Sequence, residues 1–488
     1  MYTVKTFGAQ CAGVASQRHT HRGMRTHDRQ VASHLKGFLV NTVVKRVLSI
    51  SMAFVGLSVG AGFASGQEVL QFFVKFGMKG VLGALAVGVA MAFIGMIILQ
   101  LGSYYQADGH NVVLDEMAHP ITAKFLDFCV MLTIFSIGMV MFAGAGANFD
   151  QQFGWPSWTG SVLLLVLTLV LGRFDVDKVS QIIGAITPGI IILVLVAAVY
   201  SIMHAPSDLS VLEPMAAEIQ STLPNYWISS LNYIGLSLMV VVSMSIVIGG
   251  YYLNPRIAGI GGLVGGAVFG ALLFLSALIL FLQVGDLGDA DLPMLTLVTN
   301  IHPTLGLLMS IAIYGMIFNS ALGMFFALTS RLTTGHPERF NKVFVITVLI
   351  GFAASFMGFK NLVSYVYPAL GYVGVLLMAL LCINWIRDHA TISAESRRRA
   401  RIRDLVRLKL DPAQRFTAKD EKELAKRVSK SNIADADLIE TVHEKVTEEL
   451  VADDDIEFTE EDAAVVMEEL STSEQDAVAE VEGAKGDK

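Results

Sequence analysis

The stretch Gly56-Leu57-Ser58-Val59-Gly60-Ala61-Gly62-Phe63-Ala64-Ser65-Gly66-Gln67-Glu68 decides how this chain folds. Four glycines and two serines interrupt an otherwise apolar segment, and each glycine weakens a helix by about 1 kcal/mol relative to alanine. We therefore predict that a membrane-spanning helix breaks between Ser58 and Gly66. Irregular backbone at membrane depth is stable only where protein buries it or where it lines a wet cavity. The stretch thus predicts a membrane protein and the position of its binding site.

The composition of the whole chain indicates that lipid is its solvent. The 488 residues are 53% hydrophobic and only 16% charged, and the mean hydropathy of +0.58 is too high for an ordinary soluble globule. Apolar stretches near the ~20 residues that cross a bilayer lie at 43–73, 80–102, 122–147, 157–172, 179–203, 227–250, 257–283, 304–330, 342–359 and 361–386. The sequence predicts an all-α polytopic membrane protein with about ten transmembrane helices.

Residue patterns typical of enzymes and cofactor sites are absent from the sequence. Cys11, Cys129 and Cys382 lie far apart, so they form neither a disulfide framework nor a metal-spaced cluster. No Gly-x-x-x-x-Gly-Lys phosphate-binding motif occurs, so bound ATP is not expected as an energy source. The predicted spans contain no His and Cys or paired-carboxylate constellation. We predict no enzyme, no cofactor and no nucleic-acid partner; the oligomeric state cannot be read from the sequence.

Arginines and lysines orient the predicted spans, because short loops rich in these residues stay on the cytoplasmic side. With the amino terminus inside, the cytoplasmic connections carry Arg173, Lys178, Arg256, Arg331, Arg339, Lys342 and Arg397 to Arg403. The opposite connections carry Lys75, Lys79 and Lys360. This asymmetry predicts a multi-pass protein of the bacterial cytoplasmic membrane with both termini in the cytoplasm.

The segments outside the spans differ from them in charge. Residues 1–42 are expected to form a disordered cytoplasmic leader, or to precede the true start, since Met24 is also able to open the chain. Residues 388–488 form a charged cytoplasmic tail, helical or disordered, because 435–482 holds 19 Asp and Glu against one lysine. At 394–408, Ile402, Leu405 and Val406 recur at helical spacing among arginines. This segment is either a helix on anionic lipid or the positive flank of the last span.

The ten predicted spans of residues 43–387 divide into two halves of five. Because five is odd, the second half enters the membrane from the side opposite to the first. This is an inverted repeat, the architecture of several secondary transporters. A five plus five bundle is therefore the predicted fold of the membrane domain.

The predicted break in the first span has two interpretations. In the first, a half-helix beginning near Ser65 offers free N–H groups to an anion, and carbonyls around Val59 to Gly62 suit a cation. In the second, the glycine pairs Gly56 and Gly60, and Gly62 and Gly66, form a face where helices pack closely. The first interpretation gives these candidate solute-binding residues: Gly60, Ala61, Gly62, Ser65, Gly66 and Gln67.

Glu68 is the deepest carboxylate of the predicted spans. An ionisable group at such depth indicates a functional site, and desolvation there favours its protonated form. Glu68 is therefore a candidate proton carrier, unless it lies at the mouth of the protein and reaches water.

The run Gly60-Ala61-Gly62-Phe63-Ala64-Ser65-Gly66-Gln67-Glu68, followed by Gln71-Phe72-Phe73, resembles the first span of the bacterial YkvI-type membrane proteins. That family is related to the amino acid, polyamine and organocation transporters with the LeuT fold. The resemblance covers roughly residues 43–387 and excludes the leader and tail. It implies a LeuT-like five plus five inverted repeat, spans one and six broken at the substrate site, and a sodium or proton gradient as driving force. It implies no particular substrate.

The resemblance also implies where the remaining site residues lie. Span six is expected to supply Asn232, Tyr233, Gly235 and Ser237 from the patch Asn232-Tyr233-Ile234-Gly235-Leu236-Ser237, although interhelical hydrogen bonding also explains that patch. A coupling sodium ion would lie between the Val59 carbonyl region and oxygens of span eight, here Asn319 and Ser320. The absence of a neighbouring Ser or Thr pair there departs from the sodium-coupled pattern.

Two functions remain open from the sequence. The broken span and the inverted repeat predict a secondary transporter of a small amine- or carboxylate-bearing solute, amino-acid-like, by symport with sodium or protons. The alternative is a membrane sensor that keeps the transporter fold and signals through its charged tail.

Overall fold

The structure is a computed structural model that describes residues 43–172, 186–287, 289–411, 414–451, 458–459 and 461–466. The leader 1–42 and the chain beyond 466, on which two expectations rest, lie outside these residues. Within them, all regular secondary structure is helical, as the sequence predicts.

The first half of the membrane domain begins with a helix over 43–58 that ends inside the glycine-rich stretch. It continues as α2 (Ala61–Ser65), α3 (Gln67–Phe72), the 3-10 turn η1 (Val74–Phe76), α4 (Gly77–Tyr105), α5 (His110–Met117), α6 (Pro120–Phe153), α7 (Ser157–Leu171) and α9 (Ile186–Met203). The connection to the second half holds η2 (Leu209–Val211) and α10 (Leu212–Ala217).

The second half repeats this order of long and short helices. It consists of α11 (Tyr226–Tyr251), α12 (Pro255–Leu282), α13 (Val284–Leu287), α14 (Pro293–Ile301), α15 (Pro303–Leu332), η3 (Pro337–Arg339), α16 (Phe340–Ala354), η4 (Ser355–Met357) and α17 (Phe359–Leu410). The tail adds α18 (Ala418–Val428) and α19 (Asp435–Val451).

Each predicted span matches a helix or, for the first, a broken helix. Seven helical segments of the described chain are long and apolar enough to cross a membrane. Two shorter apolar helices, α7 and the segment Pro188–Met203, occupy the positions of the fourth and fifth predicted spans. The fold is therefore that of an all-α polytopic membrane protein.

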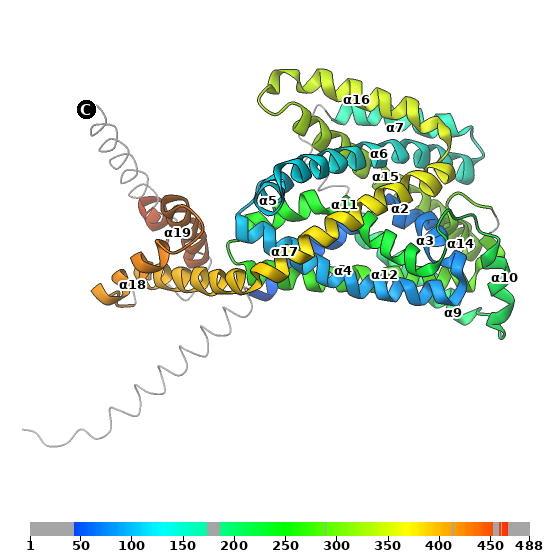
Figure 1. The fold of residues 1–488 in the computed structure, drawn as a ribbon. Helices are drawn as coiled ribbons and strands as arrows, with labels where there is room; N and C mark the ends of the chain where they lie inside the picture. The colour runs from blue at the N-terminus through cyan, green and yellow to red at the C-terminus, as the bar shows by residue number, and fades with distance from the viewer. Residues whose placement is uncertain are drawn as a thin grey trace, which may run out of the picture.

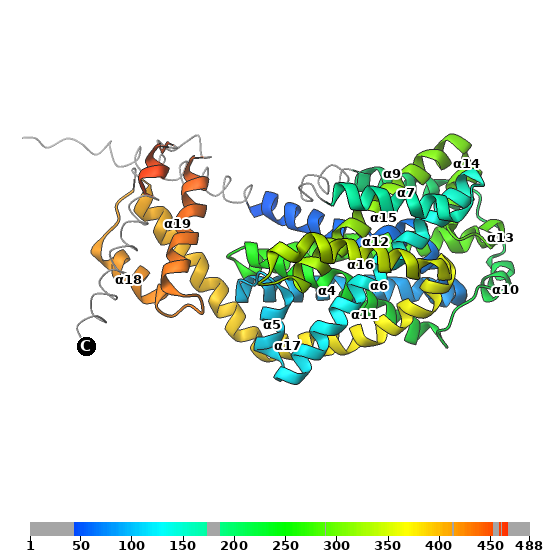
Figure 2. The same ribbon diagram turned by 90° about the horizontal axis from the view of Figure 1, so that it is seen from above.

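Equivalent helices of the two halves lie side by side. In the described chain α4 packs on α12, α6 on α15, and α7 on α16. The short helices that follow α4 and α12 are α5 and α14, and they lie at opposite ends of the bundle, with α5 toward the tail (Figures 1 and 2). Opposite ends are what an inverted repeat requires, because one half enters the bundle upside down relative to the other.

Glycines allow α4 and α12 to approach until their backbones touch. A Cβ built on Gly88 would lie 2.7 Å from the Gly270 Cα, and one built on Gly262 would overlap the Gly95 carbonyl. Small residues spaced four apart are how membrane helices gain close van der Waals contact. The many glycines of α12 therefore have a packing role, unlike Gly56 and Gly60 of the broken stretch.

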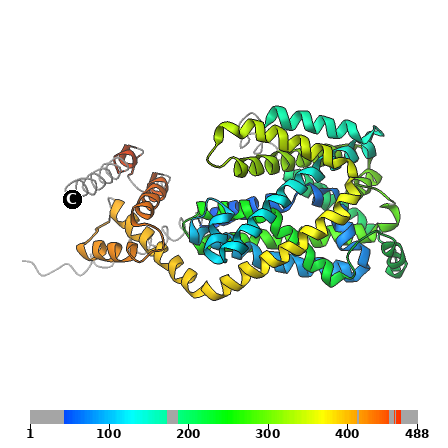
Figure 3. The same ribbon diagram turned by 45° about the horizontal axis from the view of Figure 1, so that its top comes forward.

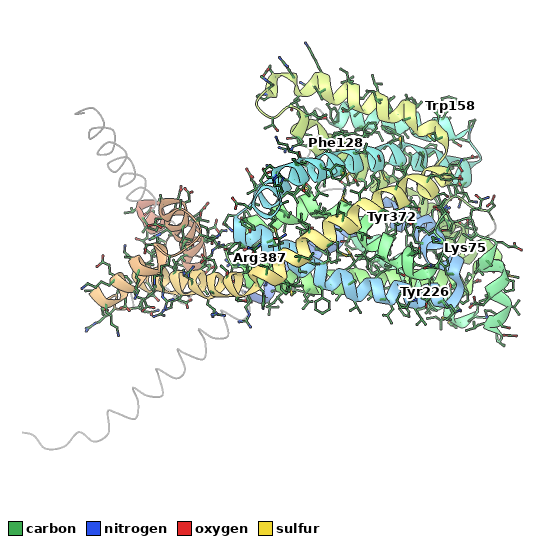
Figure 4. The ribbon with its side chains drawn as sticks, viewed as in Figure 1. Lys75, Phe128, Trp158, Tyr226, Tyr372 and Arg387 are labelled. Carbon is green, nitrogen blue, oxygen red and sulfur yellow. The ribbon has the colours of Figure 1, made fainter. Side chains whose placement is uncertain are left out.

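Large apolar side chains cover the outside of the bundle. Figure 4 labels Phe128 on α6, Trp158 on α7 and Tyr372 on α17, and all three are more than half exposed. Arg387 lies on α17 toward the tail, whereas Lys75 and Tyr226 lie near the opposite end (Figure 4). Exposed aromatic and aliphatic side chains on the flanks suit contact with lipid.

The tail is an extension of the last span. Helix α17 leaves the bundle and continues without interruption to Leu410, where the helices of the tail pack on it (Figure 3). Ile402, Leu405 and Val406 are buried, and α19 covers Ile402 and Val406 with side chains that include Val442 and Val446. The suggestion that residues 394–408 lie on lipid is therefore wrong for their apolar face, because protein already covers it. Over its described residues, the tail contains the helices α18 and α19.

Candidate functional site

The first span breaks twice within the predicted stretch. The helix over 43–58 stops after Ser58, and Gly60 has extended backbone, with φ −86° and ψ −179°. One short turn of helix, α2, follows before Gly66 adopts the left-handed conformation with φ +81°, which glycine adopts at little cost. The predicted loss of regular hydrogen bonding between Ser58 and Gly66 is confirmed, with one helical turn retained inside it.

Ser65 and Gly66 hold the second break in place. The Ser65 hydroxyl donates to the Gly62 carbonyl at 2.7 Å and accepts from the Gln67 N–H at 3.2 Å. A Cβ built at Gly66 would lie 3.1 Å from the backbone nitrogen of Met294 in α14. Ser65 and Gly66 therefore shape the broken backbone, and neither lines the cavity beside it.

The alternative interpretation, in which the pairs Gly56 and Gly60, and Gly62 and Gly66, form a packing face, fits the structure only at Gly66, which lies against α14. A Cβ built at Gly56 or Gly60 would meet nothing within 4 Å. A Cβ built at Gly62 would overlap the carboxylate of Glu68, which folds back over α2. The glycines at positions 60 and 62 thus leave room for a side chain and a cavity, and they do not bring two helices together.

A cavity of about 60 Å³ lies beside the break. It is enclosed by the broken span, α6, α11, α15 and α17. Six of the sequence-predicted residues line it: Gly60, Gly62, Glu68, Tyr233, Ser237 and Ser320. The structure therefore brings the predicted parts of spans one, six and eight to one place.

Glu68 supplies the carboxylate of this cavity. The Tyr233 hydroxyl donates to Glu68 Oε2 at 3.4 Å, and Tyr233 is itself fixed by Phe72 and Phe73, whose rings meet it edge to face at 5.2 and 5.0 Å. Hydroxyl groups of Ser58 and other serines complete the polar lining. Among the described residues that line the cavity there is no Lys, Arg or His, so no basic side chain there balances the carboxylate.

Span six differs from the expectation carried by the resemblance, since α11 is one unbroken helix of 26 residues. Asn232 and Gly235 face α17 and do not line the cavity. The Asn232 amide donates to the Pro368 carbonyl at 2.8 Å, and a Cβ on Gly235 would overlap the Gly371 carbonyl. Gly235, expected to help form the substrate site, instead permits two helices to touch.

Of four further candidates, three lie away from the cavity lining, and the side chain of the fourth is outside the described residues. Gln67 is fully buried, Val59 is fully buried, and Asn319 does not line the cavity although its neighbour Ser320 does. The side chain of Ala61 lies outside the described residues. No group of three or more potential metal ligands occurs in the described part of the chain.

Sequence reasoning missed Tyr367, which brings a second tyrosine to the cavity from α17. Its side chain is buried, and it directly precedes Pro368, the proline inside that helix. Met324 of α15 and Ile137 of α6 supply apolar wall. The dipeptide Tyr367-Pro368 was a usable signal, because a proline within a membrane helix often marks an irregularity near a site.

A separate polar group joins α5, α6 and α15 at the tail end of the bundle. His110 Nε2 lies 3.0 Å from Asp127 Oδ1, and Arg331 Nη2 donates to Asp127 Oδ2 at 3.0 Å. His110 Nδ1 lies 3.0 Å from the Ser243 hydroxyl of α11. Burial lowers the pKa of His110 below its ordinary value of 6.5, although Asp127 acts in the opposite direction. The group ties four helices together and is not part of the cavity.

Comparison with known proteins supports the fold that these features define. The chain is similar to the uncharacterized membrane protein YkvI of Bacillus subtilis (strain 168), 24% identical over 340 residues, covering 68% of this chain and 94% of YkvI. It is 26% identical to the uncharacterized protein YyaD of the same organism over 333 residues, covering 68% of this chain and 95% of YyaD. No model of a protein family matches the chain.

Solved structures give the same architecture. Mhp1 in its inward-facing conformation superposes with a TM-score of 0.50 at 14% identity, over 69% of this chain and 74% of Mhp1. MhsT in complex with L-phenylalanine gives a TM-score of 0.50 at 16% identity, over 81% of this chain and 98% of MhsT. The chain thus has the fold of the LeuT-type transporters, which are not enzymes, and the resemblance to the YkvI-type membrane proteins is confirmed.

Proposed function

We propose that this protein is a secondary active transporter of a small, amine-bearing, amino-acid-like solute, coupled to a proton gradient by alternating access. The observation that carries the proposal is the Glu68 carboxylate, which projects into a cavity formed by a broken membrane helix. In transporters, broken helices near the bilayer midplane form the substrate sites. A carboxylate at such depth is costly and is kept where it serves a function.

The charge of the cavity favours an amine over a carboxylate as the recognised group. Glu68 is the acidic residue of the lining, and the described lining offers no basic side chain that would pair with an anionic solute. A solute ammonium would pair with Glu68, and the hydroxyls of Tyr233 and Ser237 would accept its remaining hydrogen bonds. The volume of about 60 Å³ suits a compact solute. MhsT, of the same fold, binds L-phenylalanine.

The proton is the coupling ion that this lining suits best. A carboxylate binds either a proton or the solute ammonium. Protonation of Glu68 therefore lowers its occupancy by the solute, and solute binding favours release of the proton. Sodium coupling would need several oxygen ligands at one point. Ser320 and the backbone near Gly60 offer some, but Asn319 does not line the cavity. Sodium therefore remains the alternative that the transport assay must include.

Alternating access is supported by the unequal covering of the cavity. On one side, α14 packs over the second break, with Met294 against Gly66. On the other, the lining continues toward the tail along Leu57, Val240 and Val241. We propose that this state opens toward the tail and that movement of α14 away from α3 opens the opposite side. The basic residues at the tail end favour a cytoplasmic position for that end and both termini.

The experiment is uptake into proteoliposomes that contain the purified full chain. Amino acids, small amines and small carboxylates are offered under an imposed pH gradient, an imposed sodium gradient or neither. We expect accumulation of an amine-bearing solute under the pH gradient. Accumulation of carboxylates that lack an amine would overturn the amine assignment, and accumulation only with sodium would overturn proton coupling. Failure of every solute under both gradients would contradict transport itself.

One observation favours the second candidate function, a sensor that signals through the tail. The Arg399 guanidinium, on the tail segment of α17, donates to the Ser103 and Tyr104 carbonyls at the end of α4, each at 2.8 Å. Movement of the bundle therefore reaches the tail directly. Removing residues 411–488 distinguishes the functions, because a transporter retains solute flux without them, whereas a sensor retains its fold and loses its output.

A further inference from the structure

A second cavity lies where the tail meets the membrane domain. Its volume is about 350 Å³, within the range of small-molecule sites. Its walls come from helix 43–58, the connection between α11 and α12, α17 and α19. Helix 43–58, blue in Figure 2, begins on the side of the bundle that faces α19. This cavity shares no lining residue with the transport cavity.

Basic side chains exceed acidic ones around this space. Lys45, Arg46, Arg403 and Lys445 line it from three different helices. Arg46 and Arg403 share a single carboxylate, Glu449, at 2.6 and 2.5 Å. Glu448 is the acid among the described lining residues, and Glu444 also acts on Lys445, so these four basic residues outnumber the three nearby carboxylates.

Lys445 contacts a backbone carbonyl and an aromatic ring at the edge of the cavity. Its ammonium donates to the Tyr251 carbonyl at 2.5 Å and lies 5.0 Å from the centre of the Tyr251 ring. Burial, and after it the charge of Arg46, lowers the pKa of Lys445, whereas Glu444, Glu448 and Glu449 act in the opposite direction. A carbonyl and an aromatic face stabilise a cation less than an anion does. An anion in the cavity would therefore stabilise the charged ammonium group of Lys445.

Arg399, which also borders the cavity, is excluded from ligand binding by its own contacts. Its Nε donates to Glu395, and its two terminal nitrogens donate to Ser103, Tyr104, Leu253 and Asn432, at distances of 2.8 to 3.0 Å. All five N–H groups of a guanidinium are thereby used. Arg399 fixes the wall of the cavity, whereas Lys45, Arg46, Arg403 and Lys445 line the space in which a ligand would lie.

We propose that this cavity binds a phosphate-bearing anion. The excess of positive charge suits a phosphate group, and guanidinium and ammonium groups together are the usual protein partners of phosphate. Tyr251 and Tyr252 supply aromatic wall beside the basic groups, where an organic part of the ligand would lie. The phosphate belongs either to a soluble ester such as a nucleotide or to the headgroup of an anionic phospholipid. Val44 and Leu48, exposed on helix 43–58, put the mouth within reach of a bilayer surface.

The test uses the full chain in lipid nanodiscs. In the first arm, discs of zwitterionic phosphatidylcholine are titrated with ATP, AMP and inorganic phosphate by calorimetry. In the second arm, phosphatidylglycerol replaces part of the lipid in phosphate-free buffer, and the melting temperature is measured. The test variant is the double substitution Lys45→Gln with Lys445→Gln. The control, Lys419→Gln with Lys426→Gln, removes the same charge from exposed positions of α18.

Binding of a soluble phosphate that weakens about tenfold in the test variant, and not in the control, supports the cavity and a soluble source. A melting temperature raised by phosphatidylglycerol in the wild type and control, but not in the test variant, supports the cavity and a lipid source. No response in either arm, or an equal response in both double variants, overturns the proposal. Lys45→Gln alone, at an exposed position, shows the same direction of change if the double variant does not fold.

Discussion

Gly62→Ala adds one methyl group at the point where Glu68 folds back over the broken helix. The new Cβ would overlap the Glu68 carboxylate and lie 3.2 Å from its Cγ. The backbone of α2 has little freedom to yield, because the Ser65 hydroxyl holds the Gly62 carbonyl at 2.7 Å. The carboxylate must therefore swing away from Tyr233 and from the position where it would meet a solute amine.

The expected cost of Gly62→Ala falls on binding and not on folding. Losing a hydrogen bond to a charged group costs about 1.5–3 kcal/mol, so the affinity for the transported solute should fall roughly ten- to hundredfold. Stability should change little, since alanine is favoured over glycine in a helix by about 1 kcal/mol and this offsets local strain.

The assay for Gly62→Ala is concentration-dependent uptake of the solute identified in proteoliposomes, with melting temperature as the check on folding. Gly56→Ala is the matched control, because a Cβ at Gly56 meets nothing within 4 Å and Gly56 does not line the cavity. Equal apparent affinity in wild type, Gly56→Ala and Gly62→Ala would refute the position assigned to the solute.

Three further predictions concern packing, pH and the lining tyrosine. Gly262→Ala should destabilise the protein by about 1–3 kcal/mol, because the new Cβ would overlap a backbone carbonyl of α4. Gly323→Ala is the control, since a Cβ there meets open space, and it should be neutral or stabilising. Thermal unfolding of both variants measures the difference. Burial lowers the folded-state pKa of His110, so the contribution of this residue to stability is present above about pH 6.5 and is lost as pH falls below that value. The melting temperature of the wild type should therefore fall more between neutral and acidic pH than that of His110→Gln. A pH response of equal size in both would contradict this. Tyr233→Phe removes a long hydrogen bond to Glu68 and should weaken solute affinity by only a few-fold, about 0.5–1.5 kcal/mol. A complete loss of uptake in a folded variant would show that the hydroxyl has another role.

The break in the first span was predictable because its cause is local. Glycine density weakens a helix wherever it occurs, so residues 56–68 carried the signal by themselves. The helical spans followed from apolar length for the same reason. The depth of Glu68 indicated a functional role, but the sequence left open whether this carboxylate lies in a cavity or at the mouth of the protein, and the structure places it in a cavity.

The role of span six was not predictable from its sequence. α11 is apolar on most of its circumference, so the residues alone do not tell which face meets α17 and which meets the cavity. Asn232 donates to a backbone carbonyl of α17 and Gly235 lets the two helices approach closely, while Tyr233, next to Asn232 in sequence, points to Glu68. The covering of Ile402 and Val406 by α19 likewise depends on contacts between segments that are distant in the chain.

The most direct test of the account is pH-gradient-driven accumulation of the solute in vesicles that contain wild type, Glu68→Gln or Glu338→Gln. Glu338 is an exposed residue of a connection, so its substitution controls for the change of a carboxylate to an amide. We expect accumulation by wild type and Glu338→Gln, and none by Glu68→Gln, which should retain weaker solute exchange between equal pH values. Undiminished pH-driven accumulation by Glu68→Gln would contradict the central claim that this carboxylate couples the proton to the solute.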